Sequence, residues 1–196
     1  MQNKTKIDTF SANSLEILNN SKEEFYNKYI LNLELIVQNN DIKLGNKFHN
    51  LICYYLKNHE IKKFENALND KEKILWENIK NSKIAILTKS AGEKFIEQPF
   101  FIKEYIENKP FYLTGRFDAI VKIDDKYIIL DWKINNIPKN YEDTMQTLVY
   151  LHCASRLYKT NNVEMIYYSL MKNEFKKIQN KGDAFEKIKE VIKKIY

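Results

Sequence analysis

The sequence is poor in the residues that break or cross-link a chain. Of its 196 residues, four are Gly, three are Pro and two are Cys. So few Gly and Pro residues leave no room for a long flexible linker, which favours a single domain over residues 1–196. The two cysteines, Cys53 and Cys153, are too few for a four-cysteine zinc site. Because both lie in apolar helical patterns, we expect them to be small core residues.

Long apolar segments are missing as well. No stretch approaches the ~18 consecutive apolar residues of a membrane span. The N-terminal sequence Met1–Lys6 is followed by polar residues and not by the apolar segment of a signal peptide. We therefore expect a protein without membrane contact that works in the reducing cytoplasm.

The charge balance is mildly basic. Lys and Arg total 32 against 26 Asp and Glu, a formal net charge of +6. This excess fits a nucleic-acid partner, and it fits ordinary solubility charge equally well. Arginine occurs only at Arg116 and Arg156. Arg116 is notable because a guanidinium binds phosphate through two parallel hydrogen bonds, as lysine cannot, although a surface salt bridge accounts for a single arginine just as well.

Apolar periodicity predicts alternating helical and extended segments. Helical spacing occurs over residues 11–31 (as two short helices), 44–56, 61–79, 141–158 and 184–195, and β-type patterns occur over 94–102, 111–123, 127–134, 163–171 and 174–178. Pro99 in the first extended segment suggests a sheet edge or a bulge. The order of helix, three strands, helix, one or two strands, and helix predicts a mixed sheet flanked by helices, the α/β (α+β) class.

Two neighbouring predicted strands carry the most informative residues. Gly115–Asp118 lies in the first, Asp131–Lys133 ends the second, and a polar turn over 124–126 makes them a hairpin. Side chains two residues apart project to the same side of a strand, so Asp131 and Lys133 share a face. The 13-residue separation of Asp118 and Asp131 is what a short hairpin needs to set two acids side by side.

Two carboxylates beside a lysine form a plausible divalent-metal site suited to phosphodiester hydrolysis. The ordinary alternative is a salt bridge of Lys133 with Asp131 or with Asp118 at a sheet edge, since a carboxylate at a buried strand end needs a partner. The residues alone leave both interpretations open.

The ordered set of motifs resembles the PD-(D/E)XK nuclease superfamily, and within it the RecB-type branch. The motifs are Gly45–His49 on a helix, Gly115–Asp118 and Asp131–Lys133 on strands, and Gln146–Tyr150 on the following helix. The resemblance covers roughly residues 44 to 170. It implies a restriction-endonuclease-like αβββαβ core over 44–170, an N-terminal helical region over 1–43, and a C-terminal hairpin strand and helix over 171–196.

By this resemblance, Asp118 and Asp131 are metal carboxylates and His49 is a further ligand, unless it is a satisfied core histidine. The backbone carbonyl of Ile134 would complete the metal shell. Lys133 would be the third catalytic residue beside the two acids, and it would orient or help deprotonate the attacking water. The implied cofactor is Mg²⁺ or Mn²⁺, as oxygen-rich ligation favours.

The following helix supplies candidate substrate-binding residues. Gln146 and Tyr150 are four apart and share a helical face; by resemblance they contact the DNA backbone or steady Lys133, and the ordinary alternatives are a solvated Gln146 and a packed Tyr150. Arg116 is the third substrate-binding candidate. Glu97, on the strand before the acids, is either a supporting group of the site or an ordinary edge charge.

The sequence departs from the family pattern in several places. Phe117 stands where the superfamily name has proline, which leaves the metal site unaffected. The chain lacks the four cysteines of iron–sulfur relatives, so no cluster is expected, and it lacks a P-loop, so any helicase motor is a separate protein. The resemblance implies a metal-dependent deoxyribonuclease acting on single-stranded DNA or duplex ends in repair or end processing, with a helicase or repair protein as a partner. The alternative is a nuclease-like module that binds nucleic acid or protein without cutting.

Overall fold

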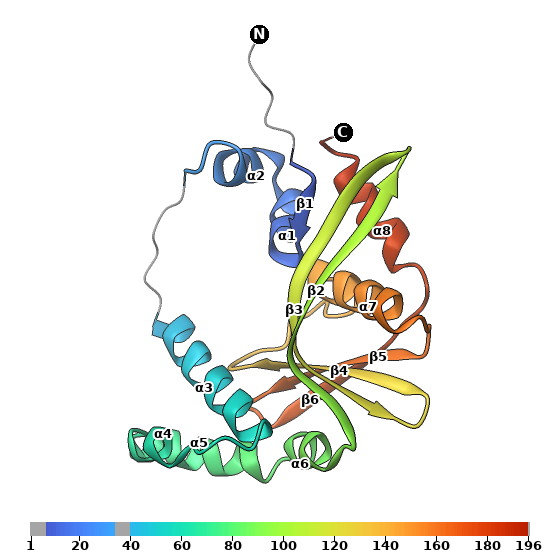
Figure 1. The fold of residues 1–196 in the computed structure, drawn as a ribbon. Helices are drawn as coiled ribbons and strands as arrows, with labels where there is room; N and C mark the ends of the chain where they lie inside the picture. The colour runs from blue at the N-terminus through green and yellow to red at the C-terminus, as the bar shows by residue number, and fades with distance from the viewer. Residues whose placement is uncertain (1–6, 34–39, 196) are drawn as a thin grey trace.

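The computed structural model describes residues 7–33 and 40–195, so Met1–Lys6 and part of the predicted region 1–43 lie outside the described residues. The described chain forms a six-stranded mixed sheet with helices on both faces (Figure 1). The order α3, β2, β3, β4, α7, β5 is the αβββαβ arrangement, so the predicted fold class is confirmed.

The element bounds follow the predicted pattern closely. The helices are α1 (Ala12–Asn20), α2 (Lys22–Tyr29), α3 (Asn40–Leu56), α4 (Lys62–Asn66), α5 (Asp70–Lys80), α6 (Lys83–Ser90), α7 (Met145–Tyr158) and α8 (Ala184–Ile192). The strands are β1 (Thr9–Ser11), β2 (Glu93–Ile106), β3 (Lys109–Ile123), β4 (Lys126–Lys133), β5 (Val163–Ser169) and β6 (Glu174–Gln179).

Three elements differ from the prediction, each for a local reason. The helix predicted over 61–79 is divided, because Asn69 caps α5 in a reciprocal capping box with Glu72. Helix α6 follows at once from a new cap, the Ser82 hydroxyl, which accepts a hydrogen bond from the Ala85 N–H. Strand β1 has only three residues, too few to show an alternating pattern.

The strand pairing of β3 determines where the Gly115–Asp118 motif lies. β2 runs antiparallel along one side of β3, from Lys109 to Lys122, and it is a sheet edge, as Pro99 suggested. On the other side, β1 pairs in parallel with 112–114 and β4 pairs antiparallel with 119–123. Among the described strands, the stretch 115–118 therefore has no strand partner on that side, and the sheet opens there.

The alternation of side chains between the two faces of the sheet is also interrupted in β3 at this point. Phe117 lies in the core formed with α1, α7 and α8, whereas Ala119 lies in the core formed with α3, α5 and α6. In a regular strand these two residues would share a face. The β2–β3 pairing is interrupted between Ile96–Ala119 and Gln98–Phe117, and Glu97 at this step has a left-handed backbone, φ 58°. The irregular backbone thus directs side chains near Asp118 toward the opening.

Candidate metal centre

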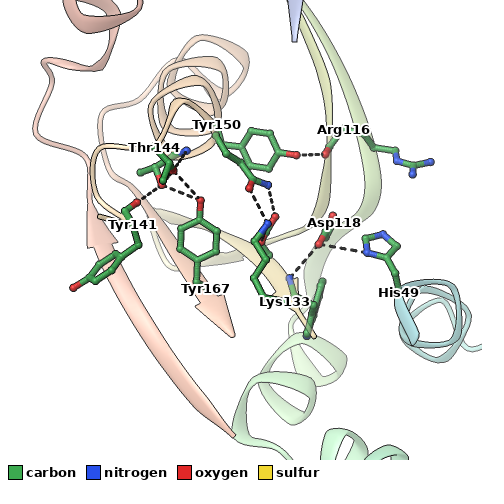
Figure 2. Close-up of polar contacts among 12 residues, drawn as sticks. His49, Arg116, Asp118, Lys133, Tyr141, Thr144, Tyr150 and Tyr167 are labelled. Carbon is green, nitrogen blue, oxygen red and sulfur yellow. Dashed lines mark hydrogen bonds and ion pairs between the residues drawn. The ribbon is translucent and has the colours of Figure 1, made fainter. Parts of the chain in front are cut away.

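Side chains from four elements converge where the sheet opens (Figure 2). β3 supplies Asp118, the end of β4 supplies Asp131 and Lys133, α3 supplies His49, and α7 supplies Gln146. The last β3–β4 pair is Ala119 with Leu130, so one more step of the register sets Asp118 opposite Asp131. The hairpin geometry expected from the 13-residue spacing is therefore what the structure has.

His49, Glu97 and Asp118 form a cluster whose potential ligand atoms all lie within 4.8 Å of one another. The His49 ring lies between the two acids, with Nε2 at 2.5 Å from Glu97 Oε1 and Nδ1 at 3.6 Å from Asp118 Oδ2. Asp118 Oδ2 also accepts a hydrogen bond from the Trp132 backbone N–H at 3.1 Å. All three side chains are partly buried.

The contacts of the ring determine which nitrogen is available. An ionised carboxylate can only accept hydrogen bonds, so Nε2 donates to Glu97 and the neutral ring then carries its lone pair on Nδ1. That lone pair faces the Asp118 carboxylate across 3.6 Å. Two acceptors facing each other are favourable when a proton or a cation lies between them. A histidine held through its other nitrogen by a carboxylate is the usual arrangement of a metal ligand.

Asp131 has different partners. It is buried, with 3% exposure; its Oδ2 lies 2.9 Å from Lys133 Nζ, and its Oδ1 accepts from Gln146 Nε2 at 2.5 Å. The amide oxygen of Gln146 accepts from Lys133 Nζ at 2.8 Å. The Asp131–Lys133 salt bridge considered from the sequence is thus present, and Gln146 holds both of its partners in place.

Burial and crowding alter the acidity of these groups. Burial, reinforced by the neighbouring Asp131, raises the pKa of Asp118 to about 7. Burial also raises the pKa of Asp131, against the opposing effect of Lys133. Burial alone would lower the pKa of Lys133, but the Asp131 carboxylate outweighs it and the pKa of Lys133 is raised. The site therefore keeps a positive ammonium beside two acids that ionise reluctantly without another cation.

Lys133 is also supported by Tyr167 of β5, which two threonines at the N-terminus of α7 hold in place. The ammonium lies 5.4 Å from the centre of the Tyr167 ring, and the Tyr167 hydroxyl contacts the hydroxyls of Thr144 at 3.3 Å and Thr147 at 3.0 Å (Figure 2). Thr144 also caps α7 by accepting from the Thr147 N–H. Sequence reasoning missed this group, although a threonine before an apolar helical pattern is a capping signal.

A model of the PD-(D/E)XK nuclease superfamily matches residues 9–196. The chain belongs to this superfamily. Its members are usually nucleases that use divalent metals, so the substrate class implied is nucleic acid. The crystal structure of SSO0001 matches with a TM-score of 0.51 over 98% of this chain and 79% of that chain. At 13% sequence identity this likeness shows a shared fold. No curated protein matches the chain.

Within the superfamily motifs, Tyr150 and Gln146 have separate partners. The Tyr150 hydroxyl donates to the carbonyl of Arg116 at 2.8 Å, in the stretch of β3 that lacks a strand partner, and its ring packs against Phe117 and Phe100. Tyr150 is buried, with 8% exposure, so it closes the opening of the sheet from the α7 side. Gln146 contacts Lys133, which is one of the two roles that the resemblance implied for it; the other was contact with the DNA backbone.

Arg116 and Ile134 lie in different surroundings. The Arg116 side chain is 60% exposed and its Nη1 lies 2.7 Å from Glu97 Oε2, so it borders the cluster. The Ile134 carbonyl accepts from the Met171 N–H at 3.0 Å and thus faces the β5–β6 connection. The structure does not bring it to the cluster. The Trp132 N–H, in contrast, faces Asp118, and in a strand the carbonyl of a residue lies on the same edge as its N–H.

Glu97 is the residue whose place the sequence left open. The structure sets it inside the cluster, in contact with His49 and Arg116. Its left-handed backbone was not readable from the pattern, because Asn, Asp and Gly are the residues that usually signal that conformation. Pro99, two residues on, marked the irregularity of the strand without showing its form.

Two open grooves border the candidate site. One, of about 400 Å³, is lined by Gly45, His49, Trp132, Lys133 and neighbouring residues. The other, of about 530 Å³, lies between β3 and the first turns of α1 and α7, and its lining includes Gln146. Residues of the candidate site thus line both grooves. No helix within the described residues is long and apolar enough to cross a membrane.

Proposed function

We propose that this chain is a metal-dependent nuclease of the RecB type that hydrolyses DNA phosphodiester bonds with Mg²⁺ or Mn²⁺. One observation carries the proposal: His49 Nδ1 lies 3.6 Å from Asp118 Oδ2, beside an Asp131 carboxylate close enough to raise the pKa of Asp118. This donor set of one imidazole and two carboxylates fits a divalent cation.

The proposed ligands are His49 Nδ1 and the carboxylates of Asp118 and Asp131. A carboxylate offers about four lone-pair positions, so Asp131 can keep Lys133 and Gln146 and still bind a cation. Glu97 holds the His49 ring through Nε2. Because the Ile134 carbonyl faces the β5–β6 connection, we assign the backbone ligand to the carbonyl of Trp132 instead.

A bound divalent cation would polarise the phosphoryl group and lower the pKa of a coordinated water. The raised pKa of Lys133 keeps its ammonium protonated, so its role is to stabilise the negative charge that builds on the phosphoryl oxygens and not to accept a proton. Gln146 fixes the position of that ammonium. The exposed guanidinium of Arg116 is available to a neighbouring phosphate.

The proposed setting is repair or end processing in the cytoplasm, together with a separate helicase or repair protein. The net charge of +6 supports an anionic polymer as substrate. This setting rests on analogy with the RecB type, whereas the chemistry rests on the site.

Cleavage assays with matched variants test the proposal. Labelled linear, circular, nicked and single-stranded DNA are incubated with Mn²⁺ and the wild type, Lys133→Ala or Asp131→Asn. Each variant should cut at least about 100-fold more slowly, because Lys133→Ala removes the ammonium that stabilises the transition state and Asp131→Asn removes a proposed metal carboxylate. Asp125→Ala removes an exposed acid of the β3–β4 turn and should cut like the wild type.

Undiminished metal-dependent cleavage by both site variants would refute the assignment. Calorimetric titration with Mn²⁺ distinguishes the nuclease from a non-catalytic binding module. A protein that binds no Mn²⁺ at a specific site but binds DNA in a salt-sensitive way would be such a module. Circular dichroism of each variant confirms that it is folded.

A further inference from the structure

The part of the β2–β3 hairpin beyond the metal centre forms an arm with two unlike faces. It comprises 99–106 of β2 and 109–116 of β3, and it extends past α7 to a tip near α8 (Figure 1). Its inner side chains, including Phe100 and Phe111, are buried in the core formed with α7 and α8. We call the opposite side the outer face; it consists of Phe101, Lys103, Tyr105, Tyr112, Thr114 and Arg116.

The outer face is aromatic and exposed. Phe101 is 62% exposed and Tyr105 is 53% exposed, unusual values for large rings on a strand. The Phe101 and Tyr112 rings stack with centroids 4.9 Å apart. The Lys103 ammonium lies 5.2 Å from the centre of the Tyr105 ring. Rings and a cation thus alternate along one surface.

The charges of the arm are sorted between its faces. The outer face carries the cations Lys103 and Arg116 and no acid. Glu104 points inward, where it pairs with His152 and Arg156. Glu97, where the face meets the metal centre, pairs with Nη1 of Arg116, whose guanidinium is 60% exposed and keeps further N–H donors for a second partner. The surface therefore favours an anionic partner with flat apolar groups.

The outer face leads directly to the metal centre. In the register, Tyr105 lies opposite Pro110, and Arg116 follows six residues along β3, about 20 Å away at the usual rise per residue. Arg116 contacts Glu97, and Glu97 contacts His49. A ligand lying on the face therefore ends at the cluster.

We propose that the outer face of the arm binds a single-stranded nucleic acid and directs it into the metal centre. Bases stack on Phe101, Tyr112 and Tyr105, while Lys103 and Arg116 hold the phosphates. A blunt duplex hides its base faces and gains only the phosphate contacts. This inference rests on the proposed function and refines its substrate class to DNA with a single-stranded segment.

Binding without cleavage tests the face directly. Fluorescence anisotropy in EDTA measures the Kd for labelled oligothymidylate, oligouridylate of equal length, and a blunt DNA duplex. Phe101→Ala and Tyr105→Ala should each weaken single-strand binding roughly 5-fold or more and leave duplex binding nearly unchanged, because each removes one stacking platform. The two oligonucleotides show which sugar the face prefers.

Matched variants separate stacking from general effects. Phe101→Tyr keeps an aromatic face and should bind like the wild type, whereas Phe101→Leu keeps apolar area without the ring and should bind like Phe101→Ala. Phe175→Ala is the control, because Phe175 is 55% exposed on β6, at the far edge of the same sheet. It should leave every Kd unchanged.

Two results would overturn the inference. One is wild-type single-strand affinity in both Phe101→Ala and Tyr105→Ala. The other is a wild-type dimer in sedimentation that Phe101→Ala dissociates while single-strand affinity stays the same, which would make the face a self-association surface.

Cleavage data distinguish this failure from failure of the proposed function. If Lys133→Ala loses cleavage but Phe101→Ala cuts overhanging and blunt duplexes in the wild-type ratio, the proposed nuclease function is supported and the role of the outer face is refuted. If the wild type does not cut, but Phe101→Ala still lowers single-strand affinity, the binding face stands without the chemistry.

Discussion

At the scale of single residues, the surroundings of the two motif glycines, Gly115 and Gly45, place different steric demands on them. A Cβ on Gly115 would lie 2.5 Å from the Phe100 ring, so the close approach of that ring requires glycine. A Cβ on Gly45 would lie 3.6 Å from Ile134 Cγ1, an ordinary contact. Gly115 is thus a packing residue beneath the site, whereas Gly45 lines the groove beside it.

We predict that Gly115→Ala lowers the free energy of unfolding by about 1–3 kcal/mol, because the added methyl overpacks the core against Phe100. Urea unfolding measures this change. Gly92→Ala is the matched control, since a Cβ there meets nothing within 4 Å.

A second substitution checks the cause of this loss. Phe100→Leu shortens the clashing ring, so its effect and that of Gly115→Ala should fail to add, and the double variant should be more stable than their sum predicts. Simple additivity would mean that the ring is not the obstacle.

At the scale of elements, α7 fastens the arm at two points. Tyr150 holds the Arg116 carbonyl near the site, and farther out the buried Glu104 of β2 pairs with His152 Nε2 at 3.0 Å and Arg156 Nε at 2.8 Å. Burial lowers the pKa of His152 despite the neighbouring Glu104. Arg156 therefore supplies the lasting positive charge for Glu104.

We predict that Glu104→Ala destabilises the protein by about 2 kcal/mol, the usual range for losing charged hydrogen bonds at a buried site. Thermal and urea unfolding measure it. Glu107→Gln, a charge change at the exposed hairpin tip, should have little effect. A Glu104→Ala protein as stable as Glu107→Gln would show that the pair with α7 does not hold the arm.

The elements that carry long periodic patterns were predictable, and the short or irregular ones were not. The hairpin of β3 and β4 followed from two apolar extended segments joined by a short polar turn, and the spacing of Asp118 and Asp131 indicated its register. Both faces of these strands are buried, each in a different core. β1 depends on a partner about a hundred residues away, and its three residues hold no pattern. The division of α4 from α5 was set by one cap at Asn69.

At the site, the motifs brought His49, Asp118, Asp131, Lys133 and Gln146 to one place, because each lies on an element that the sheet order puts there. The place of Glu97, and the carbonyl of Trp132 that we propose as the backbone ligand, could not be predicted. The first depends on a left-handed backbone and the second on which edge of β4 faces β3, and neither is encoded in a short motif.

At the scale of the whole molecule, the acidity of the site affects global stability. In the unfolded chain Asp118 ionises near 3.8, and in the folded protein burial raises its pKa to about 7. Between these values the folded state binds a proton that the unfolded state has released. The contribution of Asp118 to the stability of the metal-free protein therefore falls as pH rises from about 4 to about 7 and levels off above that.

We predict a slope of about 1.4 kcal/mol per pH unit at most from this one group, the value for one proton. Urea unfolding across this pH range in EDTA measures it. Asp118→Asn should flatten the slope, and Mn²⁺ should stabilise the wild type increasingly as pH rises, since ligands bind metal in their deprotonated form. The same dependence of stability on pH in the wild type and in Asp118→Asn, both in EDTA, would contradict the assignment.

The cluster joins the helical block 40–90 to the sheet, and this has a consequence for how the molecule is held together. His49 belongs to the contiguous helical block 40–90, whereas Asp118 and Asp131 belong to the sheet. An ion bound by both parts would cross-link them reversibly and would close the chain loop between them. Chelation would then loosen the helical block from the sheet before either part lost its own packing, and hydrogen exchange would report it first in α3.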